Sequence, residues 1–101
     1  MAEFKEVCNE ADVPPGTGIK VDVGREEIGI FNVDGKLYAI DNLCPHEGGP
    51  MSEGPLAGGI VTCPLHGWRC DVTTGESLEM PGVMVKTFEV KVEDGKVFVK
   101  V

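Results

Sequence analysis

The sequence contains no run of about eighteen apolar residues, the length that a membrane-spanning helix requires. Its 101 residues begin with Met1-Ala2-Glu3-Phe4-Lys5, which lacks the apolar stretch of a secretory signal. We therefore expect no membrane association and a cytoplasmic location, where thiols stay reduced. Four cysteines in so short a chain can then bind a metal instead of forming a disulfide scaffold.

Basic residues are also scarce. Nine Lys and Arg against 17 Asp and Glu give a formal net charge of −8. Such a surface repels nucleic acid and anionic membranes. The charge either steers the protein toward a basic patch on a partner or only keeps a small protein in solution, and composition leaves both interpretations open.

Helix signals are nearly absent, and almost every local pattern predicts β-structure. The apolar runs Glu26–Val33 and Lys36–Asp41 are joined by Asp34-Gly35, a two-residue hairpin signal. Further strands are predicted at residues 4–8, 19–23, 86–93 and 97–101, with Phe88, Val90 and Val92 on one face, and the single helical candidate is at 10–13. This pattern predicts one all-β domain over residues 1–101, an antiparallel β-sandwich or barrel.

The middle of the chain departs from this rhythm. Residues 41–84 are rich in Gly and Pro, and only 59–62 and 69–73 look like strands. Loops presented by a rigid β scaffold are the usual place for a functional site. We therefore expect the function to lie in this stretch.

Only two histidines occur, and each lies beside a cysteine. The segments are Cys44-Pro45-His46 and Cys63-Pro64-Leu65-His66, with sixteen residues between them. One thiolate and one imidazole per segment suit the iron–sulfur centre in which two His replace two Cys on one iron. Two Cys and two His also form a zinc set, but zinc fingers usually pair their cysteines in one segment and their histidines on a helix. A zinc-stabilised binding module is therefore the remote alternative.

Residues 44–50 and 63–69, followed by Asp71 and Thr74-Gly75, resemble the two cluster-binding loops of Rieske [2Fe-2S] ferredoxins from bacterial multicomponent oxygenase systems. The resemblance implies one [2Fe-2S] cluster per chain, bound in a subdomain of about 41–84. Cys44 and Cys63 would hold the buried iron, and His46 and His66 would hold the outer iron. Residues 79–83 resemble the proline-containing loop that covers the cluster in relatives, with a plain turn at Pro81-Gly82 as the alternative.

Gly49 and Leu65 stand where respiratory and photosynthetic members of the family carry an additional cysteine pair. Gly67 and Trp68 stand where those members have hydroxyl residues that donate hydrogen bonds to sulfur. Losing such donors lowers the reduction potential, so we expect a value near the bottom of the Rieske range, about −150 mV.

The resemblance further implies a monomeric one-electron carrier that is not itself an enzyme. Its transient partners would be a flavin-dependent NAD(P)H reductase as donor and a terminal oxygenase as acceptor. The alternative is a small Rieske-type subunit of a nitrite reductase, which shares the fold. A permanent subunit of that kind should expose a large apolar patch.

Cys8 and Cys70 remain outside the predicted ligand set. A buried cysteine usually acts as a small apolar side chain, and we predict that role for both. Cys70 follows the second segment closely, so an alternative ligand or a redox-active thiol is the competing interpretation. Trp68 is predicted to pack beneath the loop.

Overall fold

The computed structural model describes residues 3–42, 51–64, 67–79 and 82–100, and these are almost entirely antiparallel β-structure. The elements are β1 (Phe4–Asn9), the 3-10 helix η1 (Glu10–Asp12), β2 (Gly18–Val23), β3 (Glu26–Val33), β4 (Lys36–Asp41), the 3-10 helix η2 (Met51–Glu53), β5 (Leu56–Ala57), β6 (Ile60–Thr62), β7 (Arg69–Asp71), β8 (Thr87–Phe88), β9 (Val90–Glu93) and β10 (Lys96–Lys100). The predicted all-β fold class is confirmed. Among the described residues, no helix is long and apolar enough to cross a membrane.

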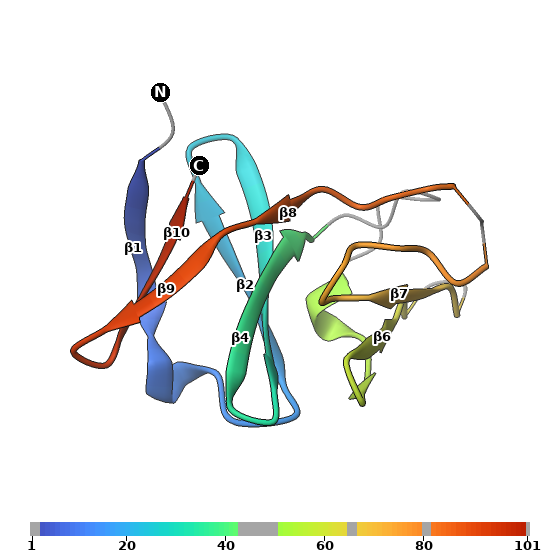
Figure 1. Ribbon diagram of the computed structural model, residues 1–101, viewed down its shortest axis with the longest axis horizontal. Coiled ribbons are helices and arrows are strands. Elements are labelled where there is room, and N and C mark those ends of the chain that lie inside the picture. The colour runs from blue at the N-terminus through green and yellow to red at the C-terminus, as the bar shows by residue number, and fades with distance from the viewer. Residues whose placement is uncertain (1–2, 43–50, 65–66, 80–81, 101) are drawn as a thin grey trace.

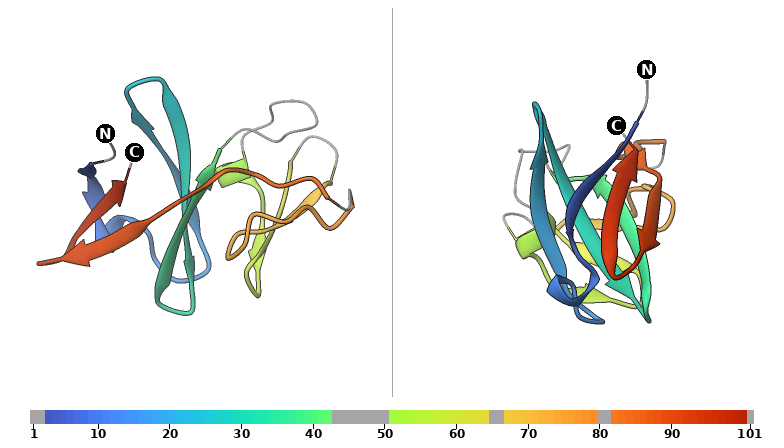
Figure 2. Two further views of the ribbon diagram at one scale, coloured as in Figure 1. Left: turned by 45° about the horizontal axis from the view of Figure 1, so that its top comes forward. Right: turned by 90° about the vertical axis from the view of Figure 1, so that its left-hand side faces the viewer.

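The strands form three sheets that follow one another across the molecule (Figure 1 and Figure 2). A sheet of order β1-β10-β9 lies at one end, and a central sheet has the order β2-β3-β4-β8. The small sheet β5-β6-β7 lies at the other end, beyond β4. The chain thus begins and ends in the same sheet, and its middle third builds the opposite end.

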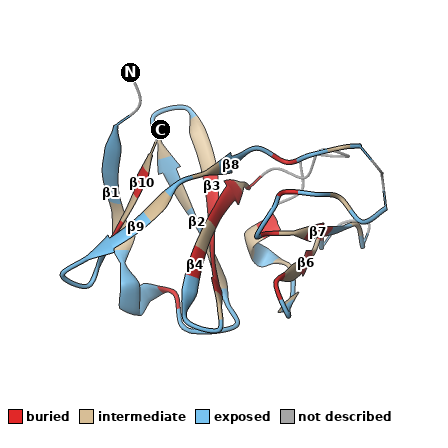
Figure 3. Cartoon of the chain, in the orientation of Figure 1, coloured by how far each residue is buried: buried red, intermediate tan, exposed pale blue. Residues whose placement is uncertain are grey.

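The central sheet is buried on both faces. In β3, Ile28 and Ile30 face a core shared with Val97 and Val99 of β10, whereas Phe31 belongs to a second core. β4 alternates in the same way, because Leu37 and Ala39 join the first core and Ile40 joins the second. Figure 3 shows the resulting concentration of buried positions on these two strands. Because successive side chains of a strand point to opposite faces, β3 and β4 hold both cores together.

The ring of Phe31 lies across two glycines. A Cβ at Gly18, its partner on β2, would lie 2.6 Å from ring atoms, and a Cβ at Gly29 would lie 2.7 Å from the ring. Both distances are too short for a real contact, so the aromatic side chain needs glycine at both positions. This packing fixes a large apolar residue on the face that carries the second core.

The predicted β3–β4 hairpin is confirmed with its turn. Asp34 and Gly35 have φ values of 52° and 92°, as a two-residue turn with two positive φ angles requires. The predicted helical stretch at 10–13 is reduced to the short 3-10 helix η1, and two short elements, η2 and β5, had no clear signal in the sequence.

Two predicted strands differ from the structure. Residues 86–93 form two strands because the chain changes sheets at Glu89: Phe88 pairs with Ala39 of β4, whereas Val90 pairs with Val99 of β10. Val92 is 40% exposed at the edge of its sheet, so Phe88, Val90 and Val92 do not share one buried face.

The strand predicted at 69–73 is also shorter, because β7 ends at Asp71. The Asp71 side chain accepts hydrogen bonds from the backbone N–H and the hydroxyl of Thr73, and the Asp71 carbonyl accepts from Gly75. These bonds turn the chain.

Truncating Ile30 tests the first core. Ile30→Ala should lower the free energy of unfolding by about 2–5 kcal/mol, because the fully buried side chain leaves a cavity between two sheets. Val92→Ala, at an exposed edge position, should change it by no more than about 0.5 kcal/mol. Urea unfolding followed by circular dichroism measures both, and equal losses would contradict the two-core packing.

Candidate metal centre

The structure describes one of the four predicted ligands. Cys63 follows β6 and is 1% exposed, whereas Cys44, His46 and His66 lie outside the described residues. In the described part of the chain, no three His, Cys, Asp or Glu side chains come together as a metal site. What the structure does define is the framework on which the two ligand segments, residues 43–50 and 63–68, are mounted.

Asn42 fixes both ends of the first ligand segment. It is 1% exposed, and its own N–H donates to the carbonyl of Glu27 at 2.8 Å, which attaches it to the central sheet. The Asn42 carbonyl accepts a hydrogen bond from Met51 at 2.8 Å, and its side-chain Oδ1 accepts one from the N–H of Ser52 at 2.8 Å. The chain therefore leaves and rejoins the body of the protein at one buried, hydrogen-bonded residue.

The second ligand segment is closed by its own backbone. The N–H of Cys63 donates to the carbonyl of Trp68 at 2.6 Å, and the N–H of Gly67 donates to the carbonyl of Cys63 at 3.0 Å. Gly67 has a φ of 73°, which glycine adopts without strain. Both peptide groups of Cys63 are thus fixed within a turn of six residues.

The anchors of the two segments share one apolar core. Met51 and Cys63 belong to the same buried cluster as Ile40 of the central sheet. Cys70 and Val61, paired across β6 and β7, complete its floor, and Trp68 packs against it. A buried thiol with a hydrogen-bonded backbone suits a soft, anionic sulfur ligand for iron, and it fits the inner position that the resemblance assigns to Cys63.

Gly54 links the two segments directly. Its N–H donates to the carbonyl of Met51 at 3.0 Å, at the end of the first segment. A Cβ on Gly54 would overlap the carbonyl oxygen of Thr62, the residue before Cys63. The backbone approaches so closely here that no other residue fits without displacing Thr62.

Glu79, the first residue of the predicted proline-containing loop, is bonded to Arg69, which directly follows the second ligand segment. Glu79 accepts hydrogen bonds from the backbone N–H, Nε and Nη2 of Arg69 at 2.8, 3.1 and 3.0 Å. Side-chain hydrogen bonding from Arg69 lowers the pKa of the Glu79 carboxyl, and the same bonds raise the pKa of the guanidinium. In the predicted proline-containing loop, Met80 and Pro81 lie outside the described residues.

The two remaining cysteines lie on different sides of the central sheet. Cys8 packs against the first core, on the face opposite Cys63, and burial, followed by the charge of Asp12, raises the pKa of its thiol. Cys70 is 2% exposed within the second core, and its Sγ lies 3.8 Å from the carbonyl of Asp71. The predicted burial of Cys70 is confirmed, whereas Cys8 is only half-buried.

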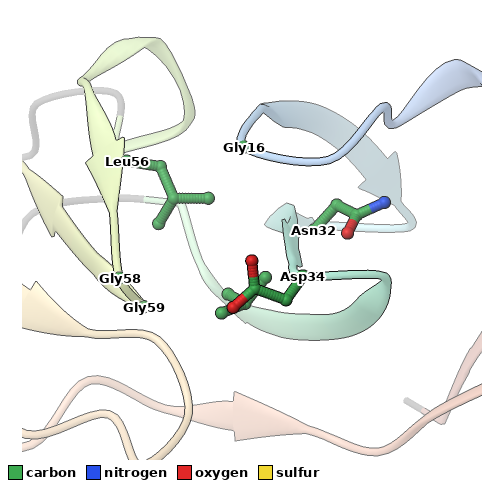
Figure 4. A pocket seen from close by; sticks show the side chains of 7 residues that line it. Gly16, Asn32, Asp34, Leu56, Gly58 and Gly59 are labelled. Carbon is green, nitrogen blue, oxygen red and sulfur yellow. The ribbon is translucent and has the colours of Figure 1, made fainter.

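A small cavity lies away from Cys63. About 50 Å³ in volume, it is bounded by the β3–β4 turn at Asp34 and by the β5–β6 turn at Gly58 and Gly59. Figure 4 shows Leu56 reaching across from the β5–β6 hairpin. Cys63 follows the other end of β6, and the cavity has room for only a few water molecules, so it is no substrate pocket.

Asn42, Gly54 and the Arg69–Glu79 pair were not identified from the sequence. One signal was available, because Arg69 is the only basic residue between Lys36 and Lys86. Gly54 and Asn42 carry no comparable signal, since their roles depend on backbone groups brought together by the fold.

Comparison with known proteins agrees with this framework. Residues 3–89 match the Rieske [2Fe-2S] domain family. The ferredoxin component of the naphthalene 1,2-dioxygenase/salicylate 5-hydroxylase systems of Ralstonia sp. is 43% identical over 90 residues, which cover 88% of this chain and 86% of the relative.

Two solved structures have the same fold. The first comes from a complex of reduced oxygenase and oxidized ferredoxin in carbazole 1,9a-dioxygenase, with a TM-score of 0.86, 36% identity and coverage of 94% of this chain and 99% of that chain. The second, a putative NADH-dependent nitrite reductase small subunit from Mycobacterium tuberculosis, has a TM-score of 0.90 at 24% identity, covering 100% and 96%, and supports the fold alone.

The chain belongs to the Rieske [2Fe-2S] domain family. It is accordingly a ferredoxin-type protein that carries a [2Fe-2S] cluster and transfers electrons, as its relatives named as ferredoxin components do, and it is not itself a catalyst.

Replacing Gly54 tests the link between the ligand segments. Gly54→Ala should push the Thr62 carbonyl away, shift the adjacent Cys63 and reduce the iron bound per chain. Gly16→Ala is the control, because Gly16 has a φ of 83° but open space around it. It should cost about 1–3 kcal/mol of stability through backbone strain, with normal iron content. Iron analysis and visible absorption measure the cluster content of both variants. The same iron content in Gly54→Ala and Gly16→Ala would contradict the proposed link between the two ligand segments.

Proposed function

We propose that Cys44, His46, Cys63 and His66 hold the cluster, with the two cysteines on the buried iron and the two histidines on the outer iron. The observation that carries this proposal is the burial of Cys63 in the core that also anchors the end of the first ligand segment. We further propose that residues 41–84 act as the cluster-binding subdomain of a single domain over 1–101. The β5-β6-β7 sheet and both segment anchors fall within that range.

When bound, the cluster supplies one-electron oxidation and reduction. The chain's own residues hold it in place and limit its contact with water. The closed turn at Cys63 fixes the sulfur position, and the apolar core behind it keeps solvent from the inner side. Asn42 gives the first segment a rigid origin on the central sheet.

The protein passes electrons, in this proposal, from a flavin-dependent NAD(P)H reductase to a terminal oxygenase, as a cytoplasmic monomer. Support comes from the relative named as the ferredoxin component of dioxygenase and hydroxylase systems, and from the likeness to a ferredoxin solved in complex with its oxygenase. A carrier that serves both a donor and an acceptor needs brief contacts, which favours an interface of under about 1,200 Å².

The alternative of a nitrite reductase small subunit is less well supported. Its support is a likeness to two putative nitrite reductase small subunits at 24% and 26% identity, below the 43% and 36% found for the two ferredoxins. The large apolar side chains exposed in the described part of the chain are Phe4, Leu78, Met84 and Val92, which are divided between two ends of the molecule. Such scattered residues do not form the broad apolar patch of a permanent subunit. Family membership sets aside the zinc-stabilised module.

Lys and Arg are nearly absent from the half of the chain that holds the proposed site. Residues 37–85 contain six acidic residues and one basic residue, Arg69, which is already bound by Glu79. The rest of the chain, with eight basic residues and eleven acidic ones, is more nearly balanced. This asymmetry favours a basic patch on the partner's docking surface over a purely solubilising role.

The ligand assignment is tested by metal content. The purified protein should contain two irons and two acid-labile sulfides per chain. Cys44→Ser and Cys63→Ser should prevent cluster retention, because a serine hydroxyl does not replace a thiolate at neutral pH. Cys8→Ser is the matched control, because Cys8 lies on the other face of the central sheet. Iron analysis and the visible spectrum measure the outcome; a cluster retained in Cys63→Ser would refute the assignment.

The docking charge is tested by ionic strength. Raising salt from 0.01 M to 1 M shortens the screening length from about 30 Å to about 3 Å, so electron delivery to an oxygenase should slow while the reduction potential stays constant. Glu53→Gln should slow delivery at low salt more than Glu10→Gln, since Glu10 lies at the far end in η1. Stopped-flow kinetics and voltammetry measure the two quantities. Equal effects of both variants would leave the charge as a solubility feature.

A further inference from the structure

The Arg69–Glu79 pair lies between two segments of the proposed site. Arg69 opens β7 directly after Trp68, which closes the turn at Cys63. Glu79 is the last described residue before Met80-Pro81. All three polar contacts from Arg69 converge on one carboxylate, two from the side chain and one from the backbone.

Residues 76–79 are held by main-chain hydrogen bonds and by Arg69. Residues 76–79 and 82–84 lie side by side, with the Ser77 N–H bonded to the carbonyl of Val83 at 3.1 Å and a bridge between Glu76 and Met84. The N–H of Leu78 donates to the carbonyl of Arg69 at 3.0 Å. Glu79, one residue further, binds the side chain and the N–H of the same arginine. Leu78 and Glu79 are thus both bonded to Arg69.

We propose that the Arg69–Glu79 ion pair is a clasp: it holds residues 76–79 against the start of β7, next to the turn at Cys63, and thereby slows loss of the cluster. The proposal rests on the proposed role of Cys63 as a ligand. Both members are positioning residues, since they act through the segments that they join.

The geometry distinguishes this pair from ordinary surface ion pairs. Six other ion pairs of the described residues have N···O distances from 3.5 to 4.0 Å, without the convergent hydrogen bonds that Arg69 makes. Exposed pairs of that kind contribute little, whereas a bidentate Arg–carboxylate pair has the directional geometry that matters. The Glu79 side chain, 31% exposed, is also less exposed than any member of those pairs.

No neighbour in the sequence can take the place of Arg69. The chain has no other Lys or Arg from residue 37 to residue 85. Loss of the guanidinium therefore leaves Glu79 without a cationic partner from this half of the chain. Among the described residues, Glu79 is the acidic side chain that pairs with Arg69. We therefore expect the two residues to act as a unit.

The test compares cluster release from holoprotein variants. Glu79→Ala removes all three acceptor contacts, and Glu79→Gln keeps one neutral acceptor oxygen for Arg69. Glu6→Ala is the control, because Glu6 makes one 3.9 Å contact with Lys96 in the distant β1-β10-β9 sheet. Visible absorbance is followed in excess iron chelator at neutral pH. We expect several-fold faster loss in Glu79→Ala, a smaller increase in Glu79→Gln and the parent rate in Glu6→Ala.

Two further readouts separate a clasp from a general loss of stability. Amide exchange at Leu78 should accelerate in Glu79→Ala and not in Glu6→Ala, since the Leu78 N–H lies next to the pair. Arg69→Ala should reproduce Glu79→Ala, and the double variant should be no faster than either single one, as expected for two residues in one interaction. If Glu79→Ala does not accumulate with a cluster, the same comparison is made with Glu79→Gln.

Cluster release at the parent rate in Glu79→Ala, or in Glu79→Gln where that variant carries the test, overturns the clasp. Additive effects of the Arg69 and Glu79 substitutions also overturn it. Failure of the proposed ligand set has a different signature, which is a cluster retained in Cys63→Ser. In that case, the amide exchange rates at Leu78 alone decide whether the ion pair holds residues 76–79 against β7.

Discussion

The constraint on which the structure depends is the double-sided burial of β3 and β4. Their alternate side chains build two cores at once, one against β10 and one beneath the β5-β6-β7 sheet. Each face therefore needs apolar residues, and the sequence has a nearly continuous apolar run where a one-sided sheet would alternate with polar residues. The first core makes the body stable, while the second supports the segments that carry the proposed ligands.

The two ligand segments are held on the second core mainly by backbone hydrogen bonds and close backbone packing. The first ligand segment originates and ends at Asn42, and the second is closed between Cys63 and Trp68. Gly54 brings the two anchors into backbone contact. Buried peptide groups that are fully hydrogen-bonded resist displacement, because opening them leaves polar groups without partners.

Much of the fold was predictable because its signals are local. The strands Glu26–Val33 and Lys36–Asp41 and the turn at Asp34-Gly35 follow from side-chain period and from tolerance of positive φ. The split at Glu89 was not predictable, since only the sheet partners, β4 for Phe88 and β10 for Val90, reveal it. For the site, cysteine and histidine spacing identified the ligand candidates and the family. The supports of that site depend on contacts between backbone groups that the fold brings together, which no periodicity records.

Charge and architecture make opposite demands on the half of the chain that holds the site. Attraction to a basic partner favours few Lys and Arg residues between 37 and 85. The proposed clasp, in contrast, requires a cation with two N–H donor groups that can bind the Glu79 carboxylate together. Arg69 satisfies both demands because Glu79 cancels its charge locally. In the proposed docking, the five other acidic residues between 37 and 85 carry their negative charge in a stretch that has no further Lys or Arg. A lysine would keep the charge but lose the forked geometry, so the architecture favours arginine at this position.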